Sequence, residues 1–237
     1  MILIYKKKNI FIGIILFFSI IFYLLFTYFI LTPDFAVTKP VNNYTIILDA
    51  GHGYPDGGAT NYDGTIIESD LNLSIVLRLQ NLLESVGINV ILTRADENGI
   101  YDSNITTIRK KKISDLENRV KIANISNASL FLSIHMNKLP QTQYFGWQCF
   151  YKNNNEKSKN FANEIQESLN SFMEKENNRK IKPISEIYLA KNIKIPFVLV
   201  ECGFLSNVQE SILLTNSSYQ DNLAWSIFIG LMNSLQK

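Results

Sequence analysis

Only two histidines occur in this chain of 237 residues, and each follows an apolar, strand-like run. His52 stands between two glycines in IILDAGHG, and His135 ends LFLSIH. Two carboxylates have comparable positions, because Glu68 lies where a loop gives way to a helix pattern and Glu201 ends PFVLVE. Two imidazoles and one carboxylate can hold a catalytic zinc ion, and a second carboxylate can handle the proton of a water. These residue types therefore predict a zinc hydrolase.

Each of these residues also has an ordinary structural interpretation. An isolated histidine is more often a surface or core residue than a ligand. Glu68 could be a first-turn carboxylate that the helix dipole stabilises. Glu201 is harder to explain in this way, because a carboxylate at the end of a buried strand costs free energy unless it is paired. Asp49 is predicted to orient an imidazole, and Arg94 and Arg119 are predicted to form structural ion pairs.

The elements that must position these residues alternate along the chain. Strand-like runs of apolar residues cover 45–49, 89–93, 130–135, 146–151, 186–190 and 197–201. Helix patterns cover 68–86, 114–127, 158–172 and 219–235, the second of them opening at a capping box formed by Ser114 and Glu117. This alternation predicts a single α/β domain with a largely parallel sheet. Ligands of such sheets gather at the carboxyl ends of the strands, where His52, His135 and Glu201 fall.

Composition and cysteine content exclude some other functions. The formal charge is only +2, and no basic stripe with interleaved aromatic residues occurs, so binding to nucleic acid is not expected. Cys149 and Cys202 stand in apolar, strand-like contexts that favour buried free thiols, although an export compartment would also permit a disulfide. A thiol nucleophile at Cys202 is disfavoured, because two metal-bound histidines would leave none to activate it.

The N-terminus is predicted to be a membrane anchor. Three lysines at positions 6–8 precede an uncharged apolar run over 9–32, long enough as a helix to cross a hydrocarbon core of about 30 Å. A cleaved signal peptide is disfavoured because Pro33, Asp34 and Phe35 follow instead of small residues. The predicted parts are a cytosolic basic end at 1–8, a transmembrane segment at 9–32, a linker at 33–43 and a catalytic domain at 44–237 outside the membrane.

Six ordered motifs resemble the zinc-dependent N-acetylmuramoyl-L-alanine amidases of the third amidase family. They are LDAGHG, IESDLNLSIVLRL, VILTR, RVKIAN, LFLSIHMN and PFVLVECGFLSN. The resemblance implies a six-stranded sheet flanked by helices, zinc held by His52, Glu68 and His135, and Glu201 as the catalytic acid/base. It also implies the substrate, which is the amide between N-acetylmuramic acid and L-alanine of the peptidoglycan stem peptide. Ala50 departs from the proline usual in the family, but the neighbouring Gly-His-Gly is intact.

A finer resemblance concerns the segment NGIYDSNITTIRKKKISDLENR, which is similar to germination-specific amidases of the spore cortex. It implies a step toward muramic-δ-lactam, in the space between the forespore membranes. Within this segment, 109–112 is expected to be a solvated charged turn rather than a binding patch. The interval between His135 and Glu201 is too short to hold an inhibitory helix besides the expected elements, so such an insertion is not expected. An activating partner protein is an open possibility. The alternatives are a vegetative autolysin and a peptidoglycan-binding regulator without catalysis.

Overall fold

The computed structural model describes residues 16–24, 26–27 and 44–236. The chain divides into two units, Met1–Pro40 and Val41–Lys237. In the first unit, residues 16–24 and 26–27 are helical. None of the helices formed by the described residues is both long enough and apolar enough to span a membrane. The predicted anchor at 9–32 lies partly outside the described residues, and the predicted segments 1–8 and 33–43 lie outside them entirely, so these three assignments stay predictions from the sequence.

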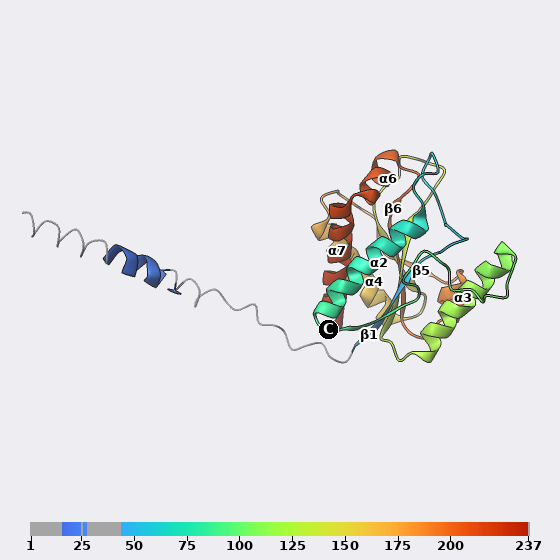
Figure 1. Ribbon diagram of the computed structural model, residues 1–237, viewed down its shortest axis with the longest axis horizontal. Helices are drawn as coiled ribbons and strands as arrows, with labels where there is room; N and C mark the ends of the chain where they lie inside the picture. Colours follow the sequence, from blue (N-terminus) through green and yellow to red (C-terminus); the bar gives the residue numbers. More distant parts are fainter. Residues whose placement is uncertain (1–15, 25, 28–43, 237) are drawn as a thin grey trace, which may run out of the picture. The chain divides into compact units, whose positions relative to one another are not determined.

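The second unit, drawn in Figure 1, is built on one sheet. This sheet has six strands in the order β2-β1-β3-β6-β4-β5. The strands are β1 (Thr45–Ala50), β2 (Asn89–Leu92), β3 (Leu130–Asn137), β4 (Gln148–Lys152), β5 (Lys182–Ile184) and β6 (Phe197–Phe204). Neighbouring strands are parallel except β4 and β6, which are antiparallel. The predicted α/β domain is therefore confirmed, with a mixed sheet.

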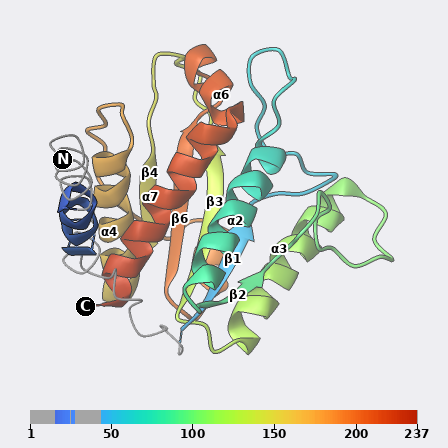
Figure 2. The same ribbon diagram turned by 60° about the vertical axis from the view of Figure 1, so that its left-hand side comes forward.

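Helices cover both faces of this sheet and make three layers. The helices are α2 (Glu68–Ser85), α3 (Ile108–Ile125), α4 (Glu156–Phe172), α5 (Tyr188–Asn192), α6 (Val208–Thr215) and α7 (Ser217–Leu235). One apolar core joins the sheet to α2, α4 and α7, which lie side by side in Figure 2, and a second core joins the opposite face to α3 and α5.

Strand alternation decides which side chains face the smaller core. In β3, Leu132 and Ile134 belong to the larger core, whereas Phe131 belongs to the smaller one. Because successive side chains of a strand point to opposite faces, His135 lies on the side of α3 and α5. Pairing in register puts Glu201 of β6 beside His135 and Gln148 of β4 beside Glu201. Three polar side chains thus follow one another across neighbouring strands, near the carboxyl ends of β3 and β6.

Two of the predicted elements were wrong in place or type. The helix expected from Ser114 begins at Ile108, and Ser114 lies buried within α3, where its Oγ accepts from the Asp102 N–H at 3.1 Å. The capping-box pattern is short enough to recur inside a helix, and the preceding lysines are good helix formers. The charged turn expected at 109–112 is accordingly the start of α3.

The strand expected at 186–190 is instead the helix α5, because a short apolar run does not distinguish strand from helix. The strand itself lies earlier, at β5, where Pro183 obscured the pattern. Proline is tolerated there because β5 is an edge strand. Helix α6 was not predicted, although Asn207, whose side chain accepts from the Glu210 N–H, is an N-cap signal in the sequence.

Candidate metal centre

His52 stands directly after β1, in a turn that depends on small neighbours. Its backbone is in the left-handed region, with φ of 62°. A Cβ atom at Gly51 would lie 2.2 Å from Nε2 of His135, and one at Gly58 would lie 2.5 Å from Oε2 of Glu68. Glycine at these two positions therefore lets the loop after β1 approach β3 and α2 closely enough for the three polar side chains to meet.

Glu68 is the first residue of α2, and its side chain is almost completely buried. Its Oε2 accepts a hydrogen bond from the Ala59 N–H at 2.7 Å, and its Oε1 accepts one from the Met136 N–H at 3.1 Å. Burial alone would raise the pKa of Glu68, but its hydrogen bonds with His135 and His52 outweigh burial and hold the pKa well below its usual range. Glu68 is therefore a fixed, charged carboxylate.

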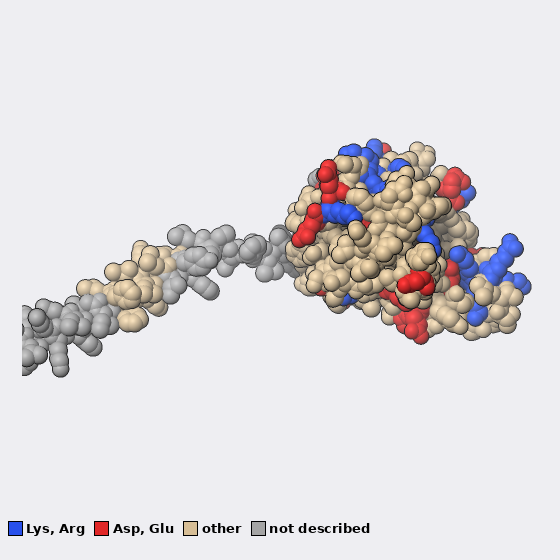
Figure 3. Space-filling view, turned by 90° about the horizontal axis from the view of Figure 1, so that it is seen from above, with Lys and Arg blue, Asp and Glu red and all other residues tan. Residues whose placement is uncertain are grey.

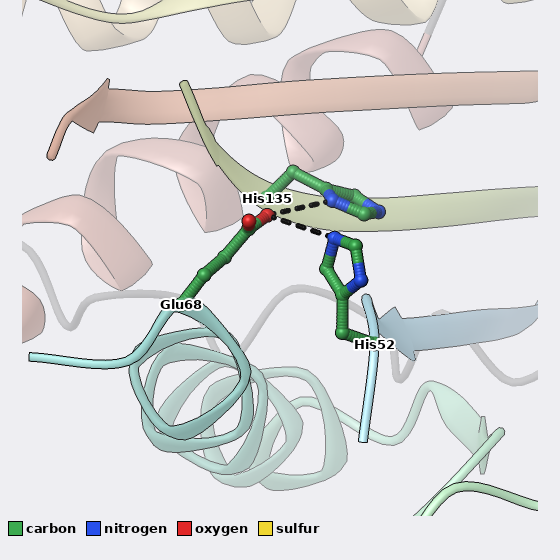
Figure 4. A group of neighbouring side chains, drawn as sticks. All are labelled: His52, Glu68 and His135. Carbon is green, nitrogen blue, oxygen red and sulfur yellow. Dashed lines mark hydrogen bonds and ion pairs between the residues drawn. The ribbon is translucent and has the colours of Figure 1, made fainter. Parts of the chain in front are cut away.

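His52, Glu68 and His135 converge in one cluster (Figure 4). Oε1 of Glu68 lies 2.9 Å from Nδ1 of His135 and 3.3 Å from Nε2 of His52, and one ligand atom from each residue lies within 4.8 Å of the others. Around a tetrahedral ion with bonds of about 2.0–2.1 Å, neighbouring ligand atoms are roughly 3.3 Å apart. The donor set and its spacing therefore fit a zinc ion. The structure brings together the three ligands that the sequence predicts.

Glu201 lies beside this cluster, on the strand that pairs with the strand of His135. Its Oε2 atom is buried and has no hydrogen-bond partner among the described residues. Burial, followed by the charge of Glu68, raises the pKa of Glu201 to about 7, despite the opposing effect of the two imidazoles. A carboxylate with this pKa can both accept and donate a proton near neutral pH, which is what a general acid/base requires.

The raised pKa of Glu201 predicts how the stability of the metal-free protein depends on pH. Glu201 has a pKa of about 7 in the fold against 4.5 as the ordinary value, so between these values the folded state binds more protons than the unfolded state. The free energy of unfolding is expected to fall as pH rises from 4.5 to 7, by about 3 kcal/mol from this group. Urea titrations of zinc-stripped protein would measure it, and Glu201→Gln should lack this part of the fall. Equal pH profiles for parent and variant would contradict the raised pKa.

His52 is oriented by Asp56, a residue that the sequence analysis did not single out. Nδ1 of His52 lies 3.0 Å from Oδ2 of Asp56. The same oxygen forms an ion pair with Nζ of Lys112 at 2.8 Å. Burial would lower the pKa of His52, but the hydrogen bonds to Asp56 and Glu68 raise it to about 9. The contact leaves Nε2 of His52 directed to the cluster. The sequence signal that could have indicated this contact is an acidic residue four positions after a histidine, across a turn.

Replacing Asp56 by Asn is expected to weaken zinc binding about 10- to 100-fold, because carboxylates that orient ligand imidazoles have effects of this size. Competition with a chromophoric chelator would measure the zinc affinity of the full-length protein. Asp63→Asn is the matched control, since Asp63 is exposed in the same loop and its carboxylate accepts from the N–H and the hydroxyl of Thr65 rather than from a histidine. An Asp56→Asn variant with parental affinity would show that the cluster does not need this contact.

Asp49 does not have the role that the sequence suggested. Its carboxylate accepts hydrogen bonds from Thr93 and Ser133 and pairs with Arg119, and no hydrogen bond joins it to either imidazole of the described domain. Arg119 is 1 % exposed, so the predicted structural ion pair is confirmed for this residue. Arg94 instead donates to backbone carbonyls, those of Ala50, Gly51, Ser69 and Asp96, and makes no ion pair within 44–236. Both arginines therefore stabilise the loop after β1 by donating hydrogen bonds to its backbone carbonyl oxygens.

The two cysteines are free and buried, and each packs in the larger core. Burial raises the pKa of Cys202 well above its ordinary value, which keeps the thiol protonated. The expectation of buried free thiols is confirmed, and Cys202 is not a suitable nucleophile.

Comparisons with known proteins agree with this fold. A family model described as N-acetylmuramoyl-L-alanine amidase matches residues 46–233. The chain belongs to the N-acetylmuramoyl-L-alanine amidase family. This amidase is 38 % identical over 193 residues to a germination-specific N-acetylmuramoyl-L-alanine amidase of Bacillus subtilis, covering 81 % of this chain and 80 % of the relative. It is 30 % identical to the amidase LytC of the same species, covering 82 % of this chain but 36 % of LytC.

A solved structure is similar over nearly its whole length. The CwlD amidase from Clostridioides difficile, solved in complex with the GerS lipoprotein, is 48 % identical to this amidase with a TM-score of 0.80. The match covers 82 % of this chain and 99 % of the CwlD chain. The predicted reaction class is therefore confirmed: this chain is a peptidoglycan amidase that acts on the bond between N-acetylmuramic acid and L-alanine.

Proposed function

We propose that this amidase acts on spore-cortex peptidoglycan, with zinc held by His52, Glu68 and His135 and with Glu201 as the catalytic acid/base. The observation that carries the catalytic part is the convergence of three ligand atoms beside an unpartnered, buried carboxylate oxygen of Glu201. The similarity to a germination-specific amidase and to CwlD supports the cortex as the substrate.

In this proposal the metal site and Glu201 have separate roles in the hydrolysis. A bound zinc ion would supply a Lewis acid for the amide carbonyl and lower the pKa of a water. Glu201, as a carboxylate, accepts the proton of the attacking water while the new C–O bond forms. Glu201, now protonated, returns this proton to the amide nitrogen as the C–N bond breaks, so the stem peptide leaves with a neutral amine. A pKa of about 7 makes both directions of transfer accessible.

A direct test measures zinc content and release of free stem peptide from purified cortex peptidoglycan, with full-length protein assayed with and without zinc. Zinc-dependent peptide release is expected. Protein that sediments with peptidoglycan and carries zinc but frees no peptide would favour a binding regulator instead.

The cortex role has its own test in a strain that lacks the gene. Spores of this strain are expected to lack muramic-δ-lactam, because the exposed lactyl carboxylate is needed to form the lactam ring. Normal muramic-δ-lactam together with chained vegetative cells would instead favour an autolysin that separates cells.

The proposed location is supported by the N-terminal sequence. Residues 9–32 are proposed as an uncleaved anchor, with the lysines at 6–8 in the cytosol and the catalytic domain outside the membrane. CwlD was solved with a lipoprotein, and a partner of this class tethered to the same membrane is proposed for this amidase. Membrane fractions of the native host should retain the protein after a salt wash. Recovery in the soluble fraction would exclude an uncleaved anchor.

A further inference from the structure

A second polar site lies at the same edge of the sheet as the metal cluster. A cavity of about 350 Å³ lies between the segment before β4 and the segment before β5. Its lining residues are Gln143, Tyr144, Phe145, Glu176, Asn177, Asn178 and Arg179. The only cation among these lining residues is Arg179, which lies over aromatic rings of two different segments, and Lys175 lies over the ring of Phe145 beside it.

Arg179 is fixed in place but keeps unused hydrogen-bond donors. Its guanidinium carbon lies 4.6 Å from the ring centre of Phe204 and 5.7 Å from that of Tyr144. Its Nε donates to the carbonyl oxygen of Phe145 at 3.2 Å. No carboxylate of the described domain forms an ion pair with Arg179, and neither terminal nitrogen has a protein acceptor there. The side chain therefore presents two N–H groups whose direction is already set.

Two carboxylates near this cavity, Glu210 and Glu176, accept hydrogen bonds from donors other than Arg179. Oε1 of Glu210 accepts from the Gly146 N–H at 2.7 Å, and its Oε2 accepts from the Phe204 N–H at 2.8 Å. Oε1 of Glu176, which lines the cavity, accepts from the side-chain amide of Asn178 at 3.4 Å. Burial raises the pKa of Glu210, and the charges of Lys175 and Arg179 oppose this shift, but no carboxylate of the described domain contacts Arg179 directly. A partly buried, unpaired guanidinium of this kind favours an anionic ligand.

The segment that carries Arg179 is fastened directly to the catalytic strands. Nε2 of Gln148, the residue paired with Glu201, donates to the Lys180 carbonyl at 2.7 Å. The Asn177 side chain donates to the Trp147 carbonyl, also at 2.7 Å. Phe204 is three residues beyond Glu201 in β6, which is about 10 Å along the strand. Arg179 is thus held within a short peptide's length of the proposed acid/base.

We propose that Arg179 is a specificity-determining residue that binds a carboxylate of the stem peptide. This inference rests on the proposed function, because it needs the scissile amide to lie beside Glu201. An extended peptide advances about 3.3–3.6 Å per residue, so a carboxylate carried about three or four residues beyond the scissile bond reaches Arg179. The planar guanidinium matches a carboxylate in a two-point hydrogen bond, which an uncharged amide group cannot reproduce.

The basic start of α3 is a weaker candidate for the same role. Lys and Arg side chains gather on the side of the domain formed by α3 (Figure 3). Arg109 and Lys110 are exposed there, whereas Lys112 already pairs with Asp56. No aromatic ring or hydrogen bond of the described domain fixes Arg109, so it supplies a matched control instead.

The experiment compares two synthetic muramoyl peptides with the same stem-peptide sequence. In one substrate the carboxylates of the stem peptide are free, and in the other they are converted to amides. The readout is the ratio of kcat/KM for the free acid to kcat/KM for the amide, measured with full-length zinc-loaded enzyme. The parent is expected to favour the acid by about tenfold or more, the usual size of a charge-assisted hydrogen bond. Arg179→Gln should bring the ratio near one, Arg179→Lys should give an intermediate ratio, and Arg109→Gln should keep the parental ratio.

Because the ratio is taken within one preparation, it does not depend on the fraction of protein that is folded. A parent that cleaves both substrates equally well would overturn the proposal and leave the amidase assignment intact. A parent that cleaves neither would count against the proposed function itself. If Arg179→Gln keeps the parental ratio but loses binding to a partner protein, the residue serves a protein interface and the stem-peptide proposal is wrong.

Discussion

Glu201→Gln is expected to lower kcat for stem-peptide release by about 10²–10⁴-fold, the usual contribution of a positioned general acid/base. Zinc content should be unchanged, because Glu201 lies outside the three-residue ligand cluster. The glutamine amide keeps the size of the side chain but cannot accept the proton of the attacking water. Single-turnover assays with metal-replete protein, together with elemental analysis of zinc, would measure both effects.

The matched control for this variant is Glu117→Gln, the same chemical change at an exposed position of α3. It should retain parental kcat. Peptide release by Glu201→Gln at the parental rate would mean that another group carries the proton. Loss of zinc from Glu201→Gln would mean instead that Glu201 is a ligand, and the two outcomes are distinguished by the metal analysis.

Arg119→Met is expected to destabilise the fold by about 3–5 kcal/mol, because it leaves the carboxylate of Asp49 buried without its cation. Both partners of this pair are almost completely buried, and Arg119 also donates to the carbonyl oxygens of Ala50 and His52. Chemical denaturation of parent and variant would measure the loss. Arg78→Met is the control, since its partner Asp221 is 61 % exposed and a surface ion pair contributes at most about 1 kcal/mol.

The double variant Asp49→Asn with Arg119→Met separates two explanations of that loss. If the cost comes from an uncompensated buried charge, neutralising Asp49 should restore part of the stability that Arg119→Met removes. If the cost comes from the lost contacts of Arg119 with the loop after β1, the double variant should be no more stable than the single one. Equal stability of Arg119→Met and parent would exclude a structural role for the pair.

Much of the fold could be predicted from the sequence, because a long segment with a regular apolar period is compatible with only one type of secondary structure. The stripe of Leu71, Ile75 and Leu79 predicts α2, and all three residues are buried in the larger core. The predictions failed where local signals were short or ambiguous. Ser114 lies in a pattern that also occurs within helices, and the apolar residues before Ala190 suit a strand or a helix equally. Only packing against the smaller core selects the helix at α5.

The sequence by itself predicted a zinc hydrolase and its candidate ligands, because scarce imidazoles at the ends of apolar runs are expected to meet at one edge of a parallel sheet. The amidase reaction was predicted only by the resemblance of six ordered motifs to a known family. The tertiary structure decided which groups serve these ligands. Asp56 orients His52 with the help of Lys112, a residue 56 positions later in the chain, and Asp49 pairs with Arg119 instead. The raised pKa of Glu201 and the unpaired state of Arg179 are likewise decided there. These properties depend on burial and on contacts between distant segments, which only the folded arrangement of strands and loops fixes.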